Sequence, residues 1–81
     1  MDVKTAAYEV GEEVVVRLAR AQVFDPRQGA VLRNRRVPPW MIARIIHCEE
    51  QLDGRRYVLS FEHRHAAYLC SVDETEIEGT A

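Results

Sequence analysis

The sequence predicts one small all-β domain, a closed barrel of four to five short antiparallel strands, and three observations lead to this prediction. The chain has 81 residues, 47% hydrophobic and 30% charged, which is typical of a single globular domain. β-branched and aromatic residues occur in short runs separated by turn residues. One long loop comes first and tight turns follow, and closure into a barrel would remove exposed sheet edges.

The first predicted strand lies within Glu12 to Ala21, because the valine run 14–16 follows the turn residue Gly11. The next segment, Val23 to Pro39, holds three prolines and is predicted to be a long loop. Residues 30–32 can form a short strand inside it. Loops of this length are usually functional, so the loop is a candidate contact surface.

The second strand is predicted over Trp40 to Glu49, which is rich in isoleucine and follows two prolines. Asp53-Gly54 is the strongest hairpin signal in the chain and leads into a third strand, Arg55 to Glu62. Alternation along this strand predicts that one face is buried, the face formed by Tyr57, Leu59 and Phe61.

The remaining chain is predicted to turn over Glu62 to His65 and to form a fourth strand from Ala66 to Val72. Asp73 to Glu76 is expected to form a short 3₁₀ turn, and Ile77 begins a last short strand. These elements suggest a flexible N-terminal segment over 1–8, a barrel over 9–78 and a C-terminal tail over 79–81.

Several motifs resemble those of SH3-like barrels of the Tudor and chromo-barrel type, and the similarity covers Tyr8 to Glu78. The matching residues are Val10-Gly11-x-x-Val14, Trp40-x-x-Ala43-x-Ile45, Asp53-Gly54, Tyr57-x-Leu59-x-Phe61-Glu62, Val72 and Ile77. The resemblance implies an SH3-like small barrel with a long first loop and a short 3₁₀ turn before the last strand. The resemblance supports the prediction of the fold more strongly than any prediction of function.

Tudor-like domains bind methylated lysine or arginine in an aromatic cage, where ring faces attract a cation. The resemblance places Trp40 and Met41 at two cage positions, Phe61 and Glu62 at an aromatic and an acidic position, and Tyr68 at a third wall. Met41 stands where an aromatic residue is common, so the cage is incomplete. The alternative is that Trp40 caps the barrel while Phe61 belongs to the core.

Charge is segregated along the chain. Residues 17–44 contain seven arginines and one acid, whereas Asp73 to Glu78 holds four acids. Arg27, Arg33, Arg35 and Arg36 lie in the long loop between Phe24 and Trp40, an arrangement that suits nucleic acid or an acidic partner. The sequence pI of about 5.9 is low for a nucleic-acid-binding domain. The acidic end could equally pair with the arginines of a second copy in a homo-oligomer.

Metal and catalytic motifs are weak. His63, His65 and Cys70 are the best candidate ligands, but no pair of cysteines or histidines has zinc-binding spacing, so no metal site is predicted. We expect no catalytic residues and no cofactor. The third alternative, after peptide and nucleic-acid binding, is a small-molecule binder or enzyme whose pocket forms between protomers.

The expected function is therefore a non-enzymatic interaction module that binds a protein segment, an acidic one or a second copy, or self-associates. Its contact surface would be the 23–40 loop and the 62–65 turn, with Trp40, Phe24, Met41, Phe61, Glu62 and Tyr68 as contact residues. No apolar run approaches the roughly 18 residues needed to cross a membrane, and the N-terminus lacks the features of a signal peptide. With only two cysteines, predicted to be small apolar residues on strands, the expected location is the cytoplasm.

Overall fold

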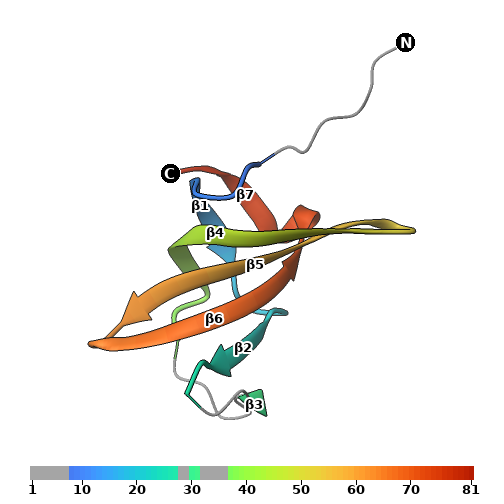
Figure 1. The fold of residues 1–81 in the computed structure, drawn as a ribbon. Coiled ribbons are helices and arrows are strands. Elements are labelled where there is room, and N and C mark those ends of the chain that lie inside the picture. The colour runs from blue at the N-terminus through green and yellow to red at the C-terminus, as the bar shows by residue number, and fades with distance from the viewer. Residues whose placement is uncertain (1–7, 28–29, 32–36) are drawn as a thin grey trace.

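The computed structural model describes residues 8–27, 30–31 and 37–81 of the chain, which form seven β-strands and one 3₁₀ helix (Figure 1). In chain order these are β1 (Glu13–Arg17), β2 (Gln22–Asp25), β3 (Ala30–Val31), β4 (Trp40–Gln51), β5 (Gly54–His63), β6 (Ala66–Asp73), η1 (Glu74–Glu76) and β7 (Ile77–Thr80). Among these residues no helix is long and apolar enough to cross a membrane.

All strands belong to one antiparallel sheet in the order β3-β2-β6-β5-β4-β1-β7. The all-β prediction is confirmed. The sheet is open, because β3 and β7 lie at opposite edges and no pairing between described residues joins them. Closure into a barrel is therefore not confirmed. The sheet twists strongly, so that β1 and β7 lie to one side of the long β4–β5–β6 layer (Figure 1).

The first half of the chain differs most from the prediction. The first strand ends at Arg17, and the chain then turns, with the Ala21 N–H donating to the Leu18 carbonyl at 3.1 Å. β2, which the sequence analysis missed, begins one residue before the predicted loop and takes up its first three residues, and the loop also contains the short β3 that was expected. β2 forms because β6 offers it a free edge, on which Val23 pairs with Cys70. Without β6, these few residues between turn formers give no strand signal.

The second half follows the prediction closely. β4, β5 and β6 each extend one or two residues beyond the predicted ends, and η1 is the expected 3₁₀ turn. β7 continues through Gly79 and Thr80, which the sequence analysis placed in a C-terminal tail. Of the N-terminal segment predicted to be flexible, residues 1–7 lie outside the described part of the chain.

Alternation along the strands places the core on one side of the sheet, where the twisted halves face each other. Tyr57, Leu59 and Phe61 point inward from β5 and are at most 5% exposed, as their alternation predicted. The complete set of buried residues is Val14, Val16, Leu18, Ala21, Val23, Ala43, Ile45, Tyr57, Leu59, Phe61, Cys70, Val72 and Ile77.

β4 contains an irregularity that resets its alternation. Ile45 pairs with Leu59, but the next pair joins His47 to Val58, so Ile46 has no partner of its own on β5. Ile46 points outward and is 42% exposed. As a result Cys48 returns to the inner side, half-buried, in line with Tyr57.

Tyr57 is fully buried, and its hydroxyl finds no hydrogen-bond partner among the described residues. Burial raises the pKa of this phenol above 10.0, and the negative charge of nearby Glu74 raises it further. The Tyr8 ring packs edge-on against it, with centroids 6.1 Å apart. Tyr57 is therefore a core residue that carries an uncompensated polar atom.

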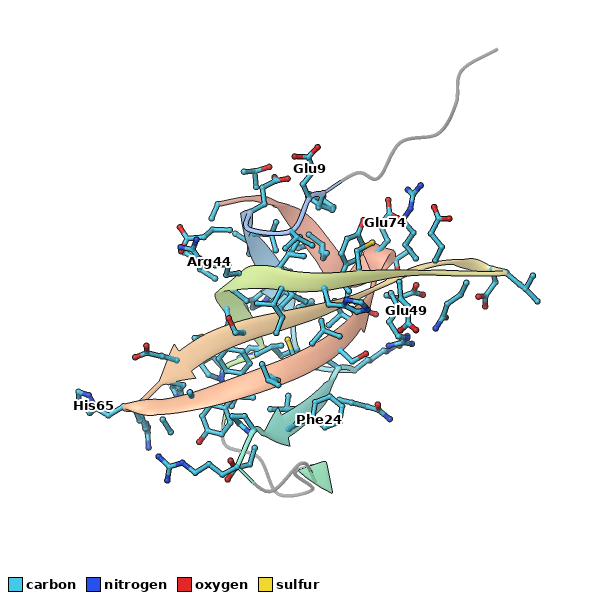
Figure 2. The ribbon with its side chains drawn as sticks, viewed as in Figure 1. Glu9, Phe24, Arg44, Glu49, His65 and Glu74 are labelled. Carbon is cyan, nitrogen blue, oxygen red and sulfur yellow. The ribbon has the colours of Figure 1, made fainter. Side chains whose placement is uncertain are left out.

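Two hairpins with two-residue turns connect the long strands, and their backbones differ. Arg64 and His65 join β5 to β6 with φ of 52° and 65°, the sign pattern of a type I′ turn. Leu52 and Asp53 join β4 to β5 with negative φ, and the positive φ of 145° falls on Gly54. The His65 turn lies at the far end of the β5–β6 layer, away from the body of the molecule (Figure 2).

Candidate functional site

β4 and β5 separate at one end of the sheet. Their pairing runs from Gln51 and Gly54 to Arg44 and Ser60 and stops there. Beyond that point residues 40–43 of β4 pair only with β1, and residues 61–63 of β5 pair only with β6. Two strand segments therefore face each other across a gap without sharing a ladder.

Backbone polar groups point into this gap. On the β1 side, the Ile45 N–H donates to the Glu12 carbonyl at 2.9 Å and the Pro39 carbonyl accepts from Leu18 at 2.7 Å. Because successive residues of a strand direct their N–H and C=O groups to opposite sides, Ile42 directs its groups away from β1. The same alternation on β5 turns the groups of Glu62 toward β4. These two residues have no strand partner across the gap.

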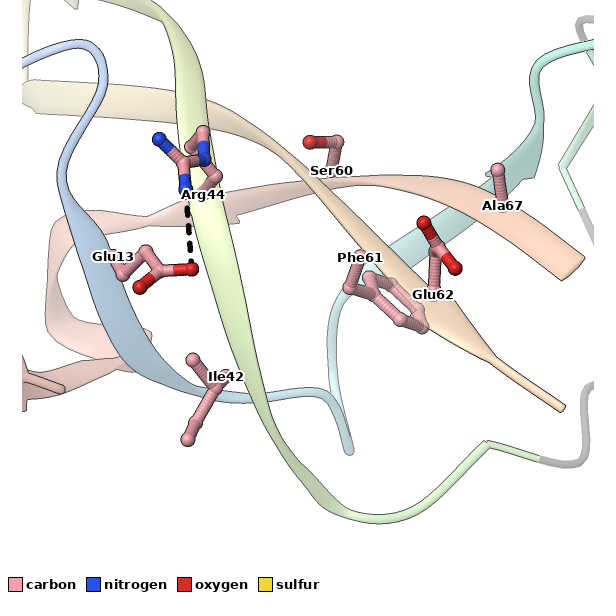
Figure 3. A pocket seen from close by; sticks show the side chains of 7 residues that line it. All are labelled: Glu13, Ile42, Arg44, Ser60, Phe61, Glu62 and Ala67. Atoms are coloured by element: carbon pink, nitrogen blue, oxygen red, sulfur yellow. Dashed lines mark hydrogen bonds and ion pairs between the residues drawn. The ribbon is translucent and has the colours of Figure 1, made fainter. Parts of the chain in front are cut away.

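An open groove of about 380 Å³ lies at this separation (Figure 3). Ile42 contributes an apolar surface from β4 and is 58% exposed. The edge of the Phe61 ring lies across from it, on β5. The groove is lined by Glu13, Ile42, Arg44, Ser60, Phe61, Glu62 and Ala67, and so combines an apolar centre with charged ends.

The charged groups of the groove are unequally compensated. Arg44 Nη2 lies 3.3 Å from Glu13 Oε2, and Arg44 Nη1 donates to the Gly11 carbonyl at 3.4 Å. Glu62, on the opposite side, is exposed and forms no ion pair with any described residue. The groove therefore carries one internally paired cation, Arg44, and one carboxylate, Glu62, that has no ion-pair partner among the described residues.

Trp40 lies on the outer face of β4, two residues from Ile42, and is 46% exposed. The Arg17 guanidinium sits 5.0 Å from the centre of its ring, and Arg17 Nη2 is 2.6 Å from Glu78 Oε2. Trp40 therefore already has a cation from its own chain over one ring face. It is an exposed residue rather than a buried cap of the core.

The aromatic residues predicted for a cage are divided between different places. Phe61 is almost completely buried and stacks on Tyr68, with ring centroids 5.5 Å apart. Met41 is half-buried against the core. Phe24 pairs with Leu69 on the outer face of β2 and β6. Of the residues predicted for the site, the groove brings together Phe61 and Glu62, whereas Trp40 does not line it.

The predicted arginine surface falls largely outside the described residues. Arg33, Arg35 and Arg36 lie there. Arg27 is exposed in the turn after β2, where its N–H donates to Asp25 Oδ1 at 2.9 Å and so fixes the start of the turn.

The weak metal-ligand candidates are separated by the sheet. His63 and His65 lie at the end of the β5–β6 hairpin, whereas Cys70 is fully buried in the core opposite Leu59. Across the part of the chain that the structure describes, no three histidine, cysteine or acidic side chains are grouped to hold a metal ion. Neither Cys48 nor Cys70 is part of a disulfide.

Sequence reasoning missed five residues of the groove. Their only sequence signal is the alternation of Ile42 and Arg44 on the outer side of an apolar strand. The ladder between β4 and β5 ends because of how the sheet twists, and no local pattern marks that point. The missed residues are Glu13, Ile42, Arg44, Ser60 and Ala67.

Comparisons with protein-family models, with curated proteins and with solved structures find no match to this chain.

Proposed function

We propose that this chain is a small non-enzymatic interaction module, with the architecture of an open SH3-like barrel, that binds an extended segment of another protein. The segment would add as a strand in the groove between β4 and β5. One observation carries the proposal: the backbone groups of Ile42 and Glu62 point into the gap without a strand partner. Strand addition satisfies such groups and gains affinity from main-chain hydrogen bonds.

The shape of the groove favours a peptide over a small molecule. Its volume of about 380 Å³ is near the low end of ligand sites, and it is open along its length. Such a groove encloses little of a small ligand. A strand would instead run along it, with side chains packing on Ile42 and against the edge of Phe61.

The proposal is tested by selecting peptides from a displayed random library against the whole protein. The chain has one tryptophan, Trp40, two residues from Ile42, so its fluorescence reports binding in the groove. We expect selected peptides to bind the wild type, and Ile42→Lys to weaken them at least about tenfold by placing a solvated charge in the apolar centre.

Ile46→Lys is the matched control. Ile46 lies on the same strand and is 42% exposed against 58% for Ile42, but it does not line the groove. Its substitution should leave affinity unchanged. If no peptide is selected, or if both substitutions weaken binding equally, the proposal is wrong. The nucleic-acid alternative makes a different prediction, namely binding of a labelled oligonucleotide that is lost in an Arg33, Arg35 and Arg36 triple alanine variant.

A further inference from the structure

Glu62 is the charged group of the groove that has no ion-pair partner among the residues that the structure describes. The ion pairs of the described residues use three other carboxylates, those of Glu13, Glu50 and Glu78. A carboxylate that stands unpaired beside an apolar surface favours a ligand that brings both a cation and a hydrocarbon stem.

Resting on the proposed function, we infer that the bound segment carries a lysine or arginine that pairs with Glu62. The stems of these two side chains cover apolar surface while their charged ends reach polar partners. In the groove the stem would lie along Ile42 and the cation would meet Glu62. An acidic ligand side chain would be repelled by Glu62. Arg44 would do little to offset this repulsion, because it is already paired with Glu13 at 3.3 Å.

The neighbour of Glu62 leaves room for this contact. Ala67 lies directly opposite Glu62 in the β5–β6 register and is exposed. Its side chain ends at Cβ, so it cannot block the approach of a ligand cation from that side. Because the backbone of Glu62 also faces the gap, one residue offers the segment both a main-chain partner and a charge.

The test compares the peptides selected by the wild type, by Glu62→Lys and by Asp53→Lys. Asp53→Lys changes the net charge equally but lies in the turn at the other end of β5, where the residue is exposed. The wild type and Asp53→Lys should both select a basic residue at one fixed position. Glu62→Lys should lose that preference or select an acidic residue there. Wild-type peptides should bind this variant about fivefold more weakly at low salt, with the difference shrinking as salt rises.

The outcomes separate this inference from the proposed function. Selected peptides that depend on Ile42 but show no basic preference, or keep it with Glu62→Lys, overturn the pairing and leave strand addition intact. Failure to select any peptide overturns both. Thermal unfolding of each variant verifies that the substitutions at these exposed positions leave the fold intact.

Discussion

Replacing Arg64-His65 by Asn-Gly should stabilise the protein, because the turn between β5 and β6 holds two ordinary residues in the left-handed region. Their φ angles of 52° and 65° fit a type I′ turn, for which Asn-Gly is the preferred pair. Most L-amino acids lose roughly 1–2 kcal/mol in that region, whereas glycine loses nothing and asparagine little.

The expected gain follows from two opposing terms. Relief of strain at both positions is worth about 2 kcal/mol. The greater freedom of glycine in the unfolded chain costs about 0.5–1 kcal/mol. The net stabilisation is about 1 kcal/mol, which for a domain of this size raises Tm by about 4–8 °C.

Thermal and urea unfolding, followed by circular dichroism, measure this gain. The other hairpin supplies the control, because Leu52 and Asp53 already have negative φ. Asn-Gly at those two positions should leave stability unchanged or lower it by about 0.5–1 kcal/mol. A Tm that rises equally in both variants, or falls in the Arg64-His65 variant, would refute the reasoning from backbone conformation.

Three further predictions concern the core. Removing the unpartnered hydroxyl by Tyr57→Phe should lower the free energy of unfolding by less than about 1 kcal/mol. The folded-state pKa of Tyr57 is raised, so the contribution of the protonated phenol to the free energy of unfolding is complete below pH 10 and is lost as the pH rises above it. The Tyr57→Phe variant should therefore lose less stability in alkali than the wild type does. Half-buried Cys48 should react with a thiol reagent before fully buried Cys70, and equal rates would contradict the burial order. Leu59→Ala should cost about 2–5 kcal/mol in urea unfolding, whereas Leu52→Ala at the exposed turn should change stability by less than about 0.5 kcal/mol.

The elements that the sequence predicts well are those in which local pattern and tertiary burial agree. In β5 the alternation of Tyr57, Leu59 and Phe61 matches the buried face, because β5 itself is regular and both neighbouring strands pair with most of its length. β2 was missed because its four residues become a strand only through the edge of β6. That information lies more than 40 residues away in the sequence.

The candidate site shows the same division. Phe61 and Glu62 were identified through the resemblance to Tudor-like domains, and both line the groove. Glu13 and Ile42 were not identified, because their role depends on where the β4–β5 ladder ends. The same resemblance placed Trp40 at a cage position, but its contact with Arg17 depends on the register between β1 and β4, which no local pattern specifies.

The position of β1 in the sheet has a consequence for synthesis of the chain. β1 lies between β4 and the last strand, β7, and its Arg17 pairs with Glu78, 61 residues further along. While the protein is being made, the second edge of β1 stays open until β7 has left the ribosome. Closing so long a loop is slow compared with forming the local hairpins. The topology therefore favours one order of events: the β4–β5–β6 meander can form first, and β7, which follows it in the chain, then completes the pairing of β1.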